Sequence, residues 1–239
     1  MARHGGTRAG RWPVQLRFKT DLTSEEYVKR QAWRDATLTR CPLHPNGACS
    51  FARHGTYQRV DPRGAHIPRW YCPEGHCTFS LLADCFASRL PGTLADLEQV
   101  VAEVEKAKSL EVAANHVRPD DIALPGAICW TRRRAKHVHN TLTILLDLVP
   151  EQFPGYQPTV TSFRHRLHVD CVLYQLRGIA DAHLATLPPP LGFAPSPLNN
   201  AGRRKRVQHN MGPDPPPHDP LMSQILAFNG TRTEKHDDE

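Results

Sequence analysis

Metal-ligating side chains are concentrated in one short stretch of this chain. Residues 41–82 read CPLHPNGACSFARHGTYQRVDPRGAHIPRWYCPEGHCTFSLL and contain four cysteines and four histidines. Thiolate and imidazole are the ligands that zinc prefers, and a tetrahedral site takes about four of them. The stretch therefore predicts a zinc site, with more candidate ligands than coordination positions.

Two turns that begin with Cys-Pro carry these candidates. The first is Cys41-Pro42-Leu43-His44, and the second is Cys72-Pro73-Glu74-Gly75-His76-Cys77. Zinc ribbons hold their ion between two such turns, each with ligands about two to four residues apart. This spacing favours the ligand set Cys41, His44, Cys72 and His76. Cys49 is an alternative to His44, and Cys77 is an alternative to His76.

The expected role of the zinc ion is structural. A catalytic zinc keeps one position open for water and has a carboxylate base nearby. Glu74 lies inside the second turn, but the sequence contains neither HExxH nor the deaminase pairing of HxE with PCxxC. A hairpin of this size has too small a core to fold without the ion.

Composition sets the broad class of the protein. The chain has 239 residues, with 30 basic and 24 acidic side chains and a formal charge of +6. Seven cysteines, of which four are clustered, favour metal ligation in a reducing compartment over disulfides. No stretch approaches the roughly 18 apolar residues of a membrane span, and the first residues lack a signal-peptide core. We therefore expect a soluble, cytoplasmic protein made without a secretory signal.

Strand patterns surround the two turns. TYQRV and HIPRWYC read as strands, and Asp61-Pro62-Arg63-Gly64 between them is a typical turn sequence. Before the first turn, residues 24–39 form a short polar helix candidate that has few apolar anchors. The sequence thus predicts a hairpin bracketed by the candidate ligands.

After residue 91 the apolar period becomes helical. Residues 93–107 form one predicted helix with Thr93 as its N-cap, and SLEVAANHV forms a second, shorter one. A long amphipathic helix opens at Pro125 and has a basic N-terminal half. Residues 159–187 are again helical, with a break expected at residues 168–169.

These patterns predict an α+β protein, made of a small β zinc ribbon, an all-α helical domain and a disordered, proline-rich C-terminal tail. The tail prediction rests on ten of the 22 prolines and on the scarcity of large apolar residues. The expected parts are a basic N-terminal arm with a short helix (1–40), the zinc ribbon (41–90), the helical domain (91–187) and the tail (188–239).

The zinc-ligand stretch also resembles a known family. CPxH, RHGTYQR, IPRWYCP and TFSLL are similar to the N-terminal zinc ribbon of bacterial transposases and transposase-like proteins. The family pattern has CPxC in the first turn and RxxCxxC at the second. Here His44 and Gly75 stand where two of the family's cysteines would be, and Cys49, His76 and Cys77 are compensating candidates.

The resemblance implies a helix-turn-helix after the ribbon. SLEVAANHV would be its first helix, and the helix from Pro125 would be the recognition helix. The connection between them is about seven residues, whereas the usual motif has a turn of about three or four. A catalytic domain of the transposase type needs carboxylates at the ends of apolar strands, and no carboxylate after residue 90 follows one. We therefore expect no enzymatic activity.

The expected function is DNA binding by a transposase-related protein that lacks its own nuclease domain. The alternative is a protein-interaction scaffold or a dimerising accessory partner of a transposase. Neither a membrane nor a small-molecule substrate is expected as a partner. Besides the N-terminal arm, the expected phosphate contacts are Arg53, Arg59, Arg69, Arg132, Arg133, Arg134 and Lys136.

Overall fold

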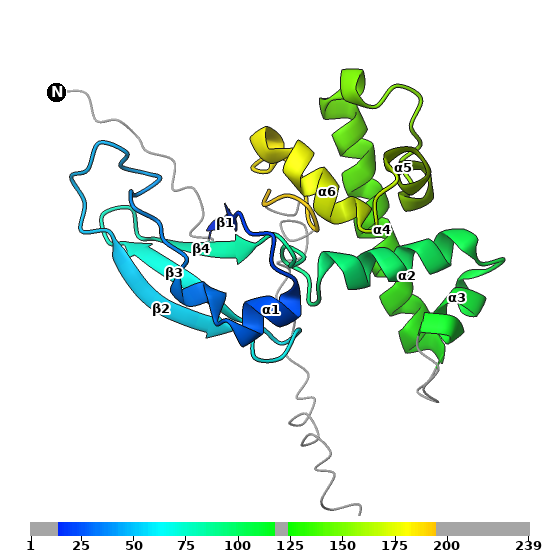
Figure 1. Cartoon of the computed structure of the whole chain (residues 1–239), viewed down its shortest axis with the longest axis horizontal. Coiled ribbons are helices and arrows are strands. Elements are labelled where there is room, and N and C mark those ends of the chain that lie inside the picture. Colours follow the sequence, from blue (N-terminus) through cyan, green and yellow to red (C-terminus); the bar gives the residue numbers. More distant parts are fainter. Residues whose placement is uncertain (1–13, 118–123, 195–239) are drawn as a thin grey trace, which may run out of the picture. The chain divides into compact units, whose positions relative to one another are not determined.

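The first half of the chain contributes a four-stranded sheet. In a computed structural model, which describes residues 14–117 and 124–194, the strand order is β1-β4-β3-β2 (Figure 1). Strands β2, β3 and β4 pair antiparallel, and β1 pairs parallel with β4. The strands are β1 (Val14–Phe18), β2 (Ala52–Gln58), β3 (His66–Cys72) and β4 (Cys77–Ala83).

The predicted hairpin is present as β2 and β3. Strand β3 coincides with HIPRWYC, whereas β2 begins four residues before TYQRV and ends at Gln58. Gly64 adopts a left-handed φ of 81° in the turn, where a side chain would be strained. Strand β1 was not predicted, because its only pairing partner is β4, more than sixty residues later in the chain.

Local capping signals define the first helices. Helix α1 (Ser24–Lys29) begins with a capping box formed by Thr23 and Glu26, and a short 3-10 turn (Ala32–Arg34) follows it. Helix α2 (Leu94–Lys106) begins as predicted after Thr93, whose hydroxyl accepts a hydrogen bond from the amide of Asp96. Both caps satisfy amides that lack a partner within the helix.

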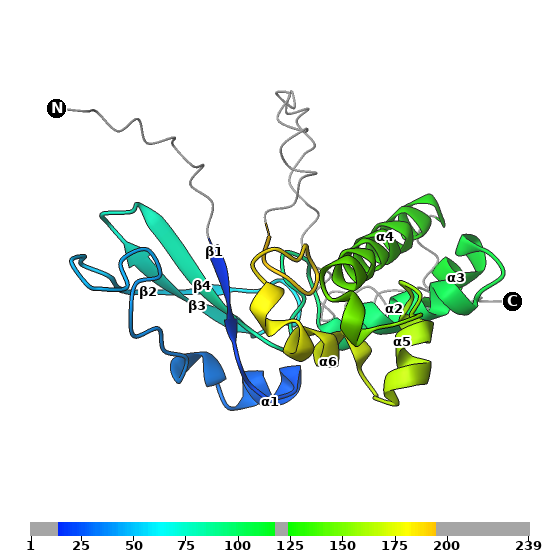
Figure 2. The ribbon, with the colours of Figure 1, turned by 90° about the horizontal axis from the view of Figure 1, so that it is seen from above.

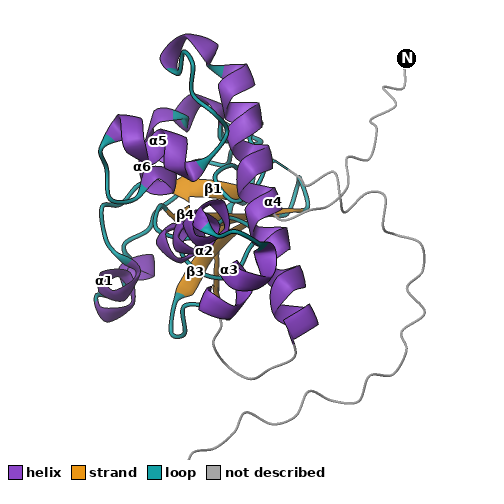
Figure 3. Ribbon diagram, turned by 90° about the vertical axis from the view of Figure 1, so that its right-hand side faces the viewer, coloured by secondary structure: helices purple, strands orange, loops and turns teal. Residues whose placement is uncertain are grey.

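Four further helices pack around α2. Helices α2, α3 and α4 contact one another, and α5 and α6 contact α2 (Figure 3). The break expected near residue 168 is present, because His168 ends α5 with a left-handed φ of 52°. The connection between α3 and α4 falls in residues 118–123, which lie outside the described residues. The helices are α3 (Leu110–Val117), α4 (Leu124–Leu148), α5 (Val160–Leu167) and α6 (Val172–Ile179).

Two apolar clusters hold these elements together. The larger one joins Ile67 and Leu82 of the sheet to buried residues of α2, α4, α5 and α6, and so crosses residue 90. The sheet and the helices lie side by side along it (Figure 1 and Figure 2). We call the smaller one the ligand-end cluster. Its buried members are Ala36, Cys41, Trp70, Cys72, Phe79 and Leu81.

The chain remains packed beyond α6. Residues 188–191 are buried, and the buried guanidinium of Arg177 donates hydrogen bonds to the carbonyls of Pro190 and Leu191. Residues 188–191, which were predicted to open a disordered tail, are therefore packed, because these prolines cover the core instead of leaving it. Residues 195–239 lie outside the described residues. The structure confirms the α+β class, and none of the described helices is long and apolar enough to cross a membrane.

Candidate metal centre

Four ligand-type side chains converge at one end of the sheet. One ligand atom from each of Cys41, His44, Cys49 and Cys72 lies within 4.8 Å of the corresponding atom of every other member. Cys41 and Cys72 are buried, while His44 and Cys49 are half-buried. The structure thus brings three of the four preferred ligands together with the alternative Cys49.

The distances suit a tetrahedral ion. Nδ1 of His44 lies 3.5 Å from Sγ of Cys41 and 3.4 Å from Sγ of Cys72. With zinc–sulfur bonds of about 2.3 Å and zinc–nitrogen bonds of about 2.05 Å, ideal tetrahedral coordination separates the two ligand atoms by about 3.6 Å. The imidazole therefore already presents its ring nitrogen to both thiols at nearly the required spacing.

A tight loop supplies three of these side chains. The amide of His44 donates to the carbonyl of Cys41 at 3.1 Å, which closes the predicted Cys-Pro turn. Gly47 and Ala48 then adopt left-handed φ values of 90° and 64°. This conformation reverses the chain and returns Cys49 to the cluster. For Ala48 it costs about 1–2 kcal/mol, because its Cβ crowds a carbonyl oxygen.

The second turn supplies Cys72 from the end of β3. The amide of Gly75 donates to Sγ of Cys72 at 3.3 Å, which fixes the position of the sulfur within the turn. Glu74 accepts a hydrogen bond of 2.9 Å from the amide of Ser50. This bond holds the pKa of Glu74 below its usual value. The carboxylate therefore links the second turn directly to the loop that carries Cys49.

The close approach of these side chains shifts the pKa values of Cys41 and Cys49 in opposite directions. Burial would raise the pKa of Cys41, but hydrogen bonds from the His44 side chain and from backbone amides outweigh it and lower this pKa to about 7. Partial burial and the neighbouring Cys41 sulfur raise the pKa of Cys49 to about 11. A cation bound between Cys41 and Cys49 would favour the thiolate form of both, because it would compensate their negative charge.

His76, predicted as the fourth ligand, lies outside this cluster. It is exposed at the tip of the β3–β4 turn with a left-handed φ of 47°, and its Nδ1 lies 3.4 Å from the hydroxyl of Tyr71. The half-buried Cys77 begins β4 and is also not a member. The first loop thus supplies three ligands and the second turn one, because the reversal at residues 47–48 places Cys49 closer than His76.

A pocket opens beside the cluster. It has a volume of about 530 Å³, and Cys41, His44 and Cys49 form part of its wall together with Arg40 and Phe51. The cluster is consequently reachable from solvent on the side of the first loop, whereas Cys72 does not line the pocket.

The three arginines of the predicted DNA-binding hairpin, Arg53, Arg59 and Arg69, contact other parts of the protein. Arg59 donates to the carbonyls of Ala87, Leu90 and Gly92, so its guanidinium faces the protein and not solvent. Arg53 donates to the carbonyls of residues 33 and 34 and lies over the ring of Trp70. Arg69 lies over Tyr57. Burial lowers the pKa of Arg59. Because its guanidinium already bonds three backbone carbonyls, Arg59 is not expected to contact phosphate.

The basic residues of α4 are placed differently. Arg132, Arg133 and Lys136 are exposed, and Lys136 lies four residues after Arg132 and three after Arg133, so it is a neighbour of both on the same side of the helix. None of the three forms an ion pair with any described residue. Arg134 is half-buried, and its guanidinium lies 3.7 Å from the centre of the Trp130 ring.

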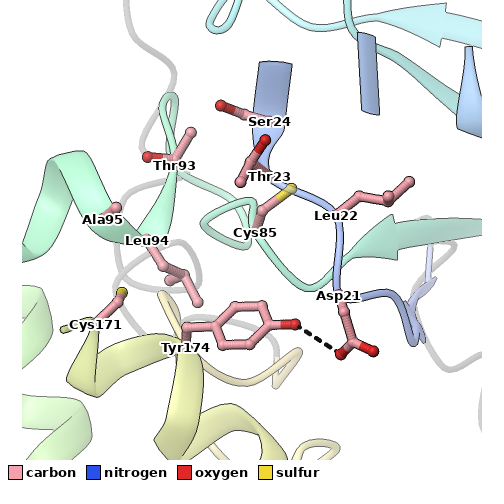
Figure 4. Close-up of a pocket in the computed structure, with 10 residues that line it drawn as sticks. All are labelled: Asp21, Leu22, Thr23, Ser24, Cys85, Thr93, Leu94, Ala95, Cys171 and Tyr174. Carbon is pink, nitrogen blue, oxygen red and sulfur yellow. Dashed lines mark hydrogen bonds between the residues drawn. The ribbon is translucent and has the colours of Figure 1, made fainter. Parts of the chain in front are cut away.

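A second pocket lies between the sheet and the helices and is largely apolar (Figure 4). Its volume is about 270 Å³, and Cys85, Cys171 and Tyr174 line it. Burial raises the pKa of each of the two thiols to about 12, so neither is a thiolate at neutral pH. The Tyr174 hydroxyl donates to the carbonyl of Thr20 at 2.8 Å and lies 3.3 Å from the carboxylate of Asp21. The arrangement provides no activated nucleophile.

Comparison with known proteins identifies no relative. No family model, curated protein or solved structure matches this chain.

Proposed function

We propose that this protein binds one structural zinc ion through Cys41, His44, Cys49 and Cys72, and that the ion holds the ligand end of the sheet in its folded form. The observation that carries the proposal is the convergence of four ligand atoms within 4.8 Å of one another. Three thiolates and one imidazole form a donor set that structural zinc sites use. All four coordination positions are then filled by the protein, which leaves none for a substrate.

The loop around the site supports this role. Residues 45–48 are exposed, and two consecutive residues are left-handed, so little apolar burial offsets the cost of this conformation. Two of the six buried residues in the ligand-end cluster are themselves ligands. Coordination of an ion offsets both the conformational cost of the loop and the small size of the ligand-end cluster, because the ion connects the loop to β3.

Metal content of single variants tests the ligand set. Purified protein is expected to retain one zinc ion per chain after dialysis against metal-free buffer, as measured by elemental mass spectrometry. Cys49→Ser is expected to lose the ion because serine is a poor zinc ligand. His76→Ala is expected to keep it because His76 lies outside the cluster.

Cys129→Ser, at an exposed cysteine on α4, is the matched control and should keep full metal content. Loss of metal in His76→Ala with retention in Cys49→Ser would favour the ligand set Cys41, His44, Cys72 and His76 instead. Wild-type protein without any bound metal would refute the proposal.

As a second function we propose that the exposed basic face of α4 binds duplex DNA. The specific observation is that Arg132, Arg133 and Lys136 point to solvent and form no ion pair with the described residues. Exposed positive side chains that are not engaged in ion pairs can replace the counterions of phosphate groups. DNA binding through α4 agrees with the transposase-related role that the resemblance of the ribbon sequence implies. Helix α4 is then the element that makes the phosphate contacts.

The alternative role, a scaffold or a dimerising partner, requires an exposed apolar stripe on α4. The apolar residues that recur along this helix are instead buried against the rest of the protein: Ala135, Val138, Leu142 and Leu145. The exposed face in the N-terminal half of α4 is instead basic, which favours the phosphate backbone over an apolar partner there.

Salt-dependent binding tests the DNA proposal. Arg132→Ala/Arg133→Ala is expected to weaken binding to duplex DNA and to reduce the slope of log affinity against log salt by about 2, since each neutralised phosphate contributes about 0.9. Fluorescence anisotropy over a salt series measures both quantities.

The matched control removes two exposed positive charges from another element. Lys29→Ala/Arg30→Ala, at the last residue of α1 and its C-cap, should leave the slope unchanged. Equal losses of DNA affinity in the two double variants would mean that binding depends only on the net charge of the protein. Affinity that does not change with salt would rule out phosphate binding at this face.

A further inference from the structure

A spare thiol lies directly beside one of the ligands. Cys77, the first residue of β4, is the antiparallel partner of Cys72, the last residue of β3. Directly opposed residues of antiparallel strands project to the same face and have their Cα atoms about 4.5–5.5 Å apart. A disulfide requires a Cα separation of about 4.4–6.8 Å. The pair therefore meets the backbone requirement for a disulfide without any movement of the strands.

The two sulfurs differ in access to solvent. Cys72 is fully buried, whereas Cys77 is half-buried and packs at the border of the ligand-end cluster. The backbone pairing therefore places Cys77 next to the proposed ligand Cys72, although Cys77 is not a member of the ligand cluster.

We propose that Cys77 is an oxidation site that controls the zinc ion, and that its oxidant is a peroxide. Peroxide reaches Cys77 and converts its thiol to a sulfenic acid with release of water. The Cys72 thiolate then attacks this sulfur and displaces hydroxide, which forms a Cys72–Cys77 disulfide. In total one thiolate, one thiol and one hydrogen peroxide give a disulfide, one water and one hydroxide.

Loss of Cys72 from the site is the consequence. A disulfide sulfur carries no negative charge and is a poor zinc ligand, since zinc binds the thiolate. Cys41, His44 and Cys49 would remain, and all of them belong to the first loop. The ion would then no longer connect that loop to β3, and it would be released. This regulatory role rests on the proposed zinc site, whereas formation of the disulfide does not.

Peroxide treatment of the full chain tests the inference. In wild-type protein we expect zinc release, followed with a chromogenic chelator, and a Cys72–Cys77 linkage in peptide mapping by mass spectrometry. Cys77→Ser should begin with the same zinc content, lose the linked peptide and release zinc much more slowly. Cys171→Ser is the matched control, because Cys171 is a half-buried thiol outside the site, and it should behave as wild type.

Equal release rates in wild type and Cys77→Ser, or mapping of the disulfide to Cys41 and Cys49, would overturn the inference. Absence of zinc from untreated wild type would count against the proposed function only. The Cys72–Cys77 linkage would still be sought in that metal-free protein, and its absence there would refute the oxidation site independently.

Discussion

Removal of the proposed zinc ion is expected to unfold the ligand end of the sheet and to leave the helices folded. Hydrogen exchange of the amides in residues 41–50 and 72–77 should approach the rate of an unstructured peptide after chelation. Structural zinc binds small finger peptides with about 10–16 kcal/mol. The ligand-end cluster has only six buried residues, two of which are proposed ligands, so its apolar contacts are not expected to keep it folded once this binding energy is lost.

The extent of unfolding follows from the division of the core. Ile67 and Leu82 lie in the larger cluster, which contains none of the proposed ligands. The start of β3 and the end of β4 should therefore stay protected together with α2 and α4–α6. Had the zinc ribbon been independent of the helices, the whole of residues 41–80 would be expected to unfold.

The fluorescence of Trp70 provides a second measurement of unfolding at the ligand end, because its side chain is only 5% exposed and belongs to the ligand-end cluster. Chelation should shift its fluorescence to longer wavelength, and Trp70→Phe should abolish that change. Cys72→Ser should reproduce the chelated state without any chelator. Loss of the helical circular dichroism signal together with the metal would contradict this division of the core.

Replacement of Arg177 by methionine is expected to cause the largest loss of stability of any single arginine substitution. Its side chain is fully buried and donates to the carbonyls of Asp84 and Phe86 at 2.9 and 2.6 Å. It also bonds the carbonyls of Pro190 and Leu191 at 2.6 and 3.0 Å. Arg177 thus joins α6, the end of β4 and the segment after residue 187.

Methionine fills similar space but removes the Arg177 donor from the buried carbonyls of Asp84, Phe86 and Leu191, while the carbonyl of Pro190 keeps a hydrogen bond from the amide of Ser88. Each such group costs about 1–3 kcal/mol, so a loss of about 4 kcal/mol or more is expected. Burial lowers the pKa of Arg177 to about 10, so the native guanidinium is still charged at neutral pH. Urea unfolding with unchanged m-values measures the difference in the free energy of unfolding.

Arg166→Met is the matched control. Arg166 also donates to two backbone carbonyls, those of Pro154 and Gly155, but it does so at the surface, where water replaces the lost bonds. Its substitution should cost less than about 1 kcal/mol. Similar losses in the two variants would show that the buried network around Arg177 contributes little to stability.

Several features of this protein could be derived from short-range patterns. The Cys-Pro turn at residue 41 and the strand that ends at Cys72 follow from residue types within a few positions of each other. The Thr93 cap of α2 and the break at His168 are equally local. Such signals act through neighbouring backbone groups, so they need no knowledge of the rest of the fold.

The fourth member of the ligand cluster and the roles of the arginines required the tertiary structure. Spacing favoured His76 and offered Cys49 as an alternative to His44, whereas the left-handed reversal at Gly47 and Ala48 places Cys49 in the cluster beside His44. Arg59 and Arg133 likewise have the same charge in the sequence, yet one faces backbone carbonyls and the other faces solvent. The sequence by itself determined the residue types, the turns and the helix ends. Contacts between residues far apart in the chain decided which side chains meet, because burial and ligand geometry depend on the path of the whole backbone.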